Sequence, residues 1–158
     1  MDILLPLFFV SLLAVPESSG LSIKEDYIKK TLQTALNIAQ TTLVHIKKLR
    51  TKLPAYPEIE VTTPSFEGIT SITHDLGLLE NELQSPSNEL LSQIQTDVSS
   101  LEGTVRSLAQ TMDCSIKPRT TVGTSDNLFP YSLLYLTLTK VQHYLEQILL
   151  NKDKLKVC

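Results

Sequence analysis

Residues 91–114, LSQIQTDVSSLEGTVRSLAQTMDC, carry an apolar side chain at alternating steps of three and four positions. The apolar positions of this stretch are Leu91, Ile94, Val98, Leu101, Val105, Leu108 and Met112. Because an α-helix completes a turn in about 3.6 residues, this spacing places the whole series on one face. The stretch predicts an amphipathic helix over residues 87–112, whose apolar face has to be covered by other parts of the chain.

Three further segments share this pattern. A helix is predicted over residues 22–53, where Ser22 and Glu25 form a capping box and Pro54 stops the helix. Its apolar positions are Ile28, Leu32, Ala35, Ala39, Leu43, Ile46, Leu49 and Leu53. The helices predicted over residues 69–84 and 131–151 carry Ile69, Ile72, Leu76, Leu79 and Leu83, and Leu134, Leu138, Val141, Leu145 and Ile148. Lys152, Lys154 and Lys156 follow the last helix, where cations suit the negative end of its dipole.

Four helices with one apolar face each predict an all-α four-helix bundle, and the connections predict its topology. About four residues join the second helix to the third, too few to travel the length of a helix, so these two are antiparallel neighbours. The other two connections have about 15 and about 16 residues. Fifteen extended residues cover about 50 Å, more than the ~40 Å length of a helix of about 27 residues. Two long connections around a short one predict an up-up-down-down bundle with two long crossover loops.

The amino terminus predicts export from the cell. Residues 3–15, ILLPLFFVSLLAV, form an apolar run that is followed by the small residues Ser18 and Gly20. The run is shorter than the ~20 residues that span a bilayer and is typical of a cleavable secretory signal. We therefore expect a signal peptide over residues 1–20, cleaved after Gly20 or alternatively after Ala14, and one secreted, extracellular domain over residues 21–158. Asp2 stands where a basic residue is usual, and a retained membrane anchor is the alternative interpretation.

The charge of the predicted domain excludes some partners. Removing the signal peptide removes Asp2 and Glu17, which leaves 15 acidic and 14 basic residues. A nearly neutral chain has no electrostatic reason to seek nucleic acid or an anionic membrane. We expect no nucleic-acid partner and no membrane insertion.

The chain has two cysteines, Cys114 and the last residue, Cys158. An even number of cysteines in a secreted chain favours a disulfide. This one would tie the carboxyl terminus back to the middle of the chain. Closing a loop of about 45 residues stabilises a domain by about 4 kcal/mol in the chain-entropy model.

The sequence offers no signature of catalysis. It contains no G-x-S-x-G, no glycine-rich phosphate loop and no H-E-x-x-H. His45, His74 and His143 lie on three different predicted helices, without a partner at the spacing of paired metal ligands. We expect no enzyme activity, no metal site and no cofactor.

Three segments together carry a resemblance to a known family. PYSLLYLTLTKVQ at residues 130–142 is similar to GYSTEVVALSRLQ of the leptin family, and QIQTDV at residues 93–98 is similar to its QISNDL. VTTPSFEG at residues 61–68 is similar to VTGLDFIPG of the same family. The spacing from Tyr131 to Cys158, and from Gln93 to Cys114, matches as well. Over about residues 28–158 the chain resembles the leptins, which are long-chain four-helix cytokines. Its lack of tryptophan indicates a diverged, non-mammalian vertebrate member.

The resemblance implies a secreted hormone, monomeric when free, that activates a class I cytokine receptor of the leptin-receptor type. Signalling would pass through JAK and STAT proteins, with a role in energy balance and appetite. In this family the main affinity for the receptor comes from the first and third helices. The matching positions, called the affinity surface below, are Thr34, Asn37, Gln40, Thr41, His45, Gln93, Ser100, Gly103 and Thr104. Most lie outside the apolar stripes and should face solvent; the alternative is that they are ordinary solvated side chains. His45 replaces an arginine of the family and Thr104 a leucine.

The resemblance also implies a second surface that drives receptor activation. Its positions, called the activation surface below, are Pro64, Ser65, Phe66, Glu67, Ser132 and Leu133. Phe66 has two interpretations, an exposed anchor for the receptor or a lid packed on the bundle. Ser132 also fits the N-cap of the fourth helix. Leu133 replaces a threonine of mammalian sequences.

Two other functions fit the sequence less well. One is another long-chain helical cytokine with a different receptor, of the interleukin-6 type. The other is an exchangeable lipid-binding bundle. Lipid-binding helices usually carry rows of Lys and Glu in repeated units, whereas the polar faces here are rich in Thr, Ser and Gln, and no internal repeat is visible.

Overall fold

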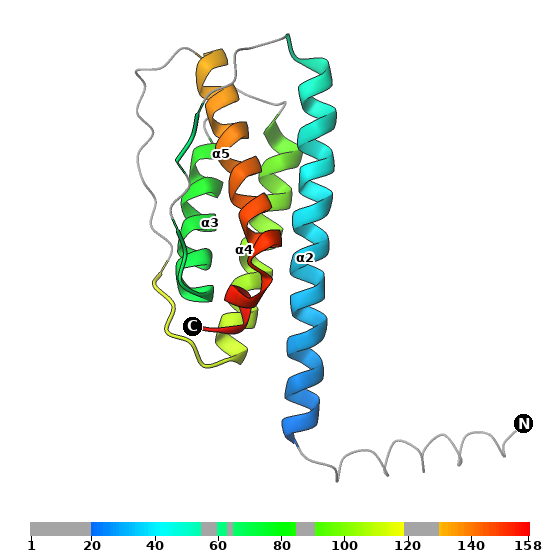
Figure 1. Ribbon diagram of the computed structural model, residues 1–158, viewed down its shortest axis with the longest axis vertical. Coiled ribbons are helices and arrows are strands. Elements are labelled where there is room, and N and C mark those ends of the chain that lie inside the picture. The colour runs from blue at the N-terminus through cyan, green and yellow to red at the C-terminus, as the bar shows by residue number, and fades with distance from the viewer. Residues whose placement is uncertain (1–19, 55–59, 63–64, 85–90, 119–129) are drawn as a thin grey trace, which may run out of the picture.

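The described part of the chain folds into four long helices and one short one. The computed structural model describes residues 20–54, 60–62, 65–84, 91–118 and 130–158, and the side chains of these ranges except those of residues 20–22 and 130–133 (Figure 1). The helices are α2 (Gly20–Lys52), α3 (Ile69–Leu83), α4 (Ser92–Thr111) and α5 (Pro130–Leu150), followed by the 3-10 helix η2 (Lys152–Lys156). The described residues include no strand, so the all-α prediction is confirmed.

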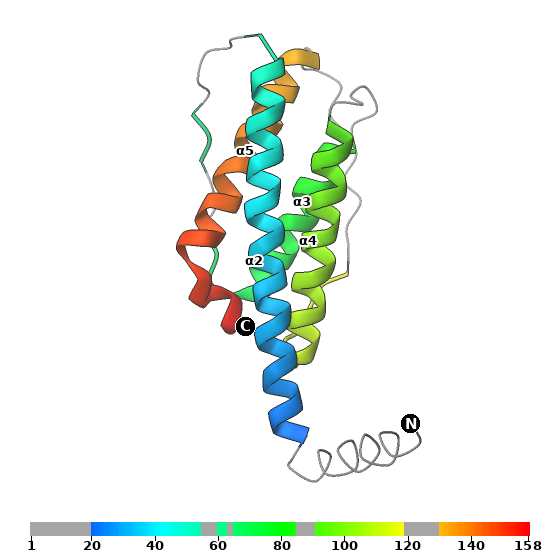
Figure 2. The same cartoon turned by 90° about the vertical axis from the view of Figure 1, so that its right-hand side faces the viewer.

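Contacts near the helix ends establish the direction of each helix. Lys24 near the start of α2 pairs with Asp113 at the end of α4, at 3.3 Å. At the other end of α2, the Arg50 guanidinium donates to Gln142 Oε1 (3.0 Å) and Thr139 Oγ1 (3.1 Å) of α5. α2 is therefore antiparallel to α4 and α5, which lie on either side of it (Figure 2). α3 packs against the same two helices and runs parallel to α2 (Figure 1). The up-up-down-down prediction is confirmed.

The apolar stripes form one core. Every stripe position predicted on α3 and α5 is buried, and so is every one on the third helix except Met112, which is half-buried. On α2 the burial is uneven, because Ile28, Leu32 and Leu43 are only partly covered. The first part of α2 extends beyond the ends of the other helices, so its stripe has fewer neighbours there (Figures 1 and 2).

Some predicted helix ends are wrong. α2 already begins at Gly20, so Ser22 lies within its first turn and is not the N-cap of a capping box. α5 begins at Pro130, which likewise places Ser132 inside the helix; proline is favoured in a first turn because its missing N–H has no partner there anyway. The third helix begins at Ser92, and residues 87–90 of its predicted range lie outside the described residues.

The lysines after the fourth helix do not occupy its last turn. α5 ends at Leu150, and these lysines belong to η2 instead. Leu155 is fully buried and holds η2 against the bundle. Burial of Leu155, more than attraction of the lysines to the helix dipole, therefore determines where η2 lies.

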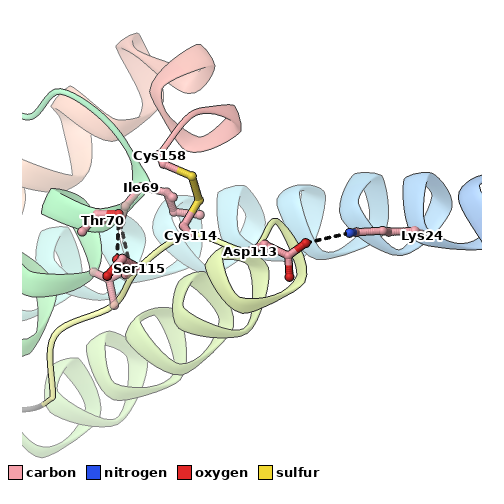
Figure 3. Close-up of a disulfide and its surroundings, with 8 residues drawn as sticks. Lys24, Ile69, Thr70, Asp113, Cys114, Ser115 and Cys158 are labelled. Carbon is pink, nitrogen blue, oxygen red and sulfur yellow. Dashed lines mark hydrogen bonds and ion pairs between the residues drawn. A yellow bond between two sulfur atoms is a disulfide. The ribbon is translucent and has the colours of Figure 1, made fainter.

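A Schellman motif ends α4 and sets the direction of Cys114. Asp113 adopts a left-handed conformation with φ 59°, which Asp tolerates better than most side chains. The Cys114 N–H donates to Ala109 O (2.9 Å) and the Asp113 N–H to Gln110 O (3.1 Å), as in this motif. The chain turns there, and Cys114 points at the start of α3 (Figure 3).

The predicted disulfide between Cys114 and Cys158 is confirmed, with 5.5 Å between the two Cα atoms. It holds the carboxyl terminus against the first residues of α3 (Figure 3). Val157 O accepts the Ile69 N–H at 2.7 Å and so satisfies one of the free donors at a helix start. A Cβ atom at Gly68 would lie 2.4 Å from the Cys158 carbonyl carbon, so only glycine permits this close approach.

Removing the bridge should destabilise the domain. We expect a variant with Cys114→Ser and Cys158→Ser together to lose about 2–5 kcal/mol of the free energy of unfolding, because the terminus is no longer tied to α4. Chemical denaturation followed by circular dichroism measures this loss. Ser115→Ala, at an exposed neighbouring position, serves as the control. An unchanged denaturation midpoint in the double variant would contradict a stabilising role for the disulfide.

Candidate functional site

The residues of the affinity surface belong to α2 and α4, two helices that lie side by side (Figure 2). On α2 the side chains of Thr34, Asn37, Gln40 and Thr41 are exposed, and His45 is half-buried. On α4, Gln93 and Ser100 are exposed, while Gly103 and Thr104 are partly covered. The structure therefore brings these positions together on one polar face of the two helices.

One hydrogen-bonded network joins the two helices within this face. The His45 ring Nδ1 lies 2.5 Å from Asp97 Oδ2, and Gln93 Nε2 donates to Asp97 Oδ1 at 2.9 Å. The Asp97 carboxylate is only 13% exposed, so it accepts from both sides in a mostly desolvated position. Asp97 was missed as a site residue, although it lies four positions after Gln93 and so on the same side of α4. The network holds two residues of the affinity surface in a fixed relation.

Val44 is a second residue that the sequence analysis missed. Its side chain is 51% exposed on α2, although it is apolar. It lies three positions after Thr41 and seven after Asn37, on the same side of the helix. An apolar side chain outside the stripe of its own helix was the available signal. Apolar area in the middle of a polar face is what the centre of a protein interface requires.

The activation surface is divided by burial. Ser65 and Glu67 are exposed, whereas Phe66 is 8% exposed and packs on Tyr144, with ring centroids 5.3 Å apart and planes tilted by 56°. The side chain of Phe66 therefore lies as a lid on the bundle, the second of its two interpretations. Pro64 lies outside the described residues, as do the side chains of Ser132 and Leu133.

Tyr144 connects this lid to α3. Its hydroxyl donates to Asp75 Oδ2 at 2.8 Å. Burial, followed by the charge and hydrogen bond of Asp75, raises the pKa of Tyr144 far above its ordinary value. The phenol is therefore neutral at any physiological pH and remains a donor. Phe66 therefore packs on the ring of Tyr144, whose orientation is held by its hydrogen bond to Asp75.

The described residues hold no group of three or more His, Cys, Asp or Glu side chains placed to bind a metal ion. None of the helices in the described part of the chain combines the length and the apolar character needed to cross a bilayer.

The architecture and the comparisons define the class and then the family. An up-up-down-down bundle of four helices with two long connections is the arrangement of the helical cytokines. No protein-family model matches the chain. Over 154 residues the chain is 49% identical to Leptin-B of Oryzias latipes, and the match covers 98% of each chain. The chain therefore belongs to the leptin family and is a diverged, non-mammalian vertebrate leptin.

The burial of Phe66 leads to a stability prediction. We expect Phe66→Ala to lower the free energy of unfolding by about 3 kcal/mol, because it removes a buried ring and leaves a void beside Tyr144. Chemical denaturation measures the loss. Ser65→Ala, at the exposed neighbouring position, should change stability by no more than about 0.5 kcal/mol. Equal, small effects of the two substitutions would contradict the lid arrangement.

Proposed function

We propose that this protein is a secreted leptin-type hormone that binds and activates a class I cytokine receptor of the leptin-receptor kind. Binding brings receptor chains together, and the signal passes through JAK and STAT proteins to an effect on energy balance and appetite. The observation that carries the proposal is the 49% identity to Leptin-B along 98% of both chains. The apolar, small-residue pattern of residues 3–20 supports secretion.

The two surfaces would have different tasks. The affinity surface offers a broad polar face on α2 and α4, with Val44 as an apolar centre. Binding energy in such faces is concentrated in a few central residues, so Thr41 and Val44 should matter more than the rim. The activation surface lies on a different part of the bundle, and its exposed side chains Ser65 and Glu67 would contact a second receptor chain.

Leptin-family membership favours a leptin-type receptor over the interleukin-6-type alternative. The experiment that tests the proposal adds refolded residues 21–158 to cells that carry a leptin receptor and measures STAT phosphorylation. Cells with an interleukin-6-type receptor are the control. A response only through the leptin receptor supports the proposal. A folded, disulfide-bonded protein that stimulates neither line, while Leptin-B stimulates the first, would overturn it.

The affinity surface makes a prediction about receptor binding. We expect Thr41→Arg to weaken binding to the leptin-receptor ectodomain at least tenfold, because a long charged side chain would stand in the middle of the interface. Stability should stay within about 0.5 kcal/mol of the wild type, because Thr41 is exposed. Surface plasmon resonance measures the affinity. Gln84→Arg, exposed at the end of α3 and outside both surfaces, is the matched control and should bind normally. Normal binding by Thr41→Arg would remove α2 from the interface.

The activation surface makes a prediction about signalling. We expect Ser65→Ala together with Glu67→Ala to lower STAT phosphorylation at saturating hormone by several-fold, with little change in receptor affinity. Both side chains are exposed, so the bundle should keep its stability. The variant leaves Phe66 unchanged, which separates activation from folding. Parallel losses of affinity and signalling would show that these residues serve binding rather than activation.

A further inference from the structure

A cavity of about 220 Å³ lies between α3, α5 and the described end of the α2–α3 connection. Its apolar walls include Leu78 and Leu79 of α3 and Val61 of the connection. Asp75 and Glu82 line it from α3, and Lys140 and Tyr144 from α5. Sites for drug-sized ligands usually measure about 300–1,000 Å³, so this cavity has the size for one side chain rather than for a whole small-molecule ligand.

The charges in the cavity do not cancel. Lys140 Nζ lies 3.3 and 3.4 Å from the two carboxylate oxygens of Glu82, so these two groups neutralise each other. Asp75 has no cationic partner among the described residues, and the group that donates to it is the neutral hydroxyl of Tyr144. Because that hydroxyl occupies Asp75 Oδ2, Oδ1 is left to accept a further hydrogen bond from a group that enters the cavity. The cavity therefore combines apolar walls with one uncompensated negative charge.

We infer that this cavity receives an arginine side chain of the receptor chain that contacts the activation surface. That the partner is a receptor rests on the proposed function. That the side chain is arginine rests on charge complementarity with the cavity. The methylene stem of arginine would lie along the leucines of α3, and its guanidinium would donate to Asp75. Tyr144 lines the cavity and also packs on Phe66, so the cavity directly adjoins the activation surface.

Other occupants match these groups less well. An apolar side chain would remove the Asp75 carboxylate from water without giving its charge a cationic partner, which costs free energy. An acidic group would be repelled. A lysine carries the right charge but is more strongly hydrated, and it lacks the planar fork that arginine can lay against the Tyr144 ring. Arginine is also among the side chains enriched at the centres of protein interfaces.

The first test uses a model of the side chain alone. Nuclear magnetic resonance of the ¹⁵N-labelled protein, titrated with N-acetyl-arginine methylamide, should show saturable shifts of the backbone amides of residues 75–82 and 140–144. N-acetyl-norleucine methylamide, which keeps the stem and lacks the charge, should bind much more weakly. Absence of saturable shifts at these amides, or equal shifts with both probes, would overturn the inference.

Two variants locate the binding group. Asp75→Asn keeps an acceptor for the Tyr144 hydroxyl but removes the charge, and it should abolish the response to the arginine probe. Leu78→Arg supplies a guanidinium from the protein itself, three positions after Asp75 and four before Glu82, and should block the probe by occupying the cavity. Asp153→Asn removes a charge of the same kind from an exposed position in η2 and should leave the response unchanged.

Receptor signalling completes the test. Asp75→Asn should lower STAT phosphorylation at saturating hormone about tenfold with little change in receptor affinity, and Asp153→Asn should not. If the probe binds but Asp75→Asn signals normally, the assignment to the receptor is wrong. If the wild-type protein fails to bind the receptor at all, the proposed function fails and the receptor part of the inference with it. The probe titration then decides by itself whether the cavity is an arginine site.

Discussion

The apolar face of α4 packs against α2 and α3 at the same time, and the layout of the bundle follows from this contact. Val98, Leu101, Val105 and Leu108 of this face are fully buried. Burying an aliphatic side chain of this size stabilises a fold by about 1.5–3 kcal/mol, so this face contributes substantially to keeping the helices together. Because α4 is antiparallel to both neighbours, α2 and α3 have to run in the same direction. The connection between them must therefore lead from the end of α2 back to the start of α3, and it carries residues 64–67 of the activation surface.

The carboxyl terminus closes the bundle where that connection ends and α3 begins. The left-handed Asp113 turns the chain after α4, the disulfide fixes Cys158 to it, and Val157 pairs with the first N–H of α3. Three segments distant in sequence meet at this point, and the missing Cβ of Gly68 leaves room for them. The segment after α5 is anchored to α3 through this junction.

Polar side chains serve two purposes in this leptin. Some are structural, as Glu102 shows: it is fully buried in α4 and pairs with Arg106 at 2.8 Å. Arg50 similarly ties α2 to α5. Others form the exposed face of α2 and α4, where many threonine hydroxyls already donate to a backbone carbonyl four residues earlier, as Thr34 and Thr104 do. Such hydroxyls keep an acceptor for a partner, and they are held in one orientation, which lowers the entropy lost on binding.

The sequence by itself determined the helices, their order and direction, and the disulfide, because each depends on local spacing or on connection length. The stripe of α4 is buried as its spacing predicts, and the short link between α3 and α4 forces them to be antiparallel. The resemblance to the leptins also predicted the positions of the affinity surface and the activation surface. Only the tertiary structure decided that Phe66 is a lid, that Glu102 is buried and that Asp97 joins His45 to Gln93. It also decided that Asp75 lines a cavity in which no described cation pairs with it. These features depend on which side chains from distant segments of the chain come into contact. A helical repeat predicts the face on which a residue lies, but not the side chains that pack against it.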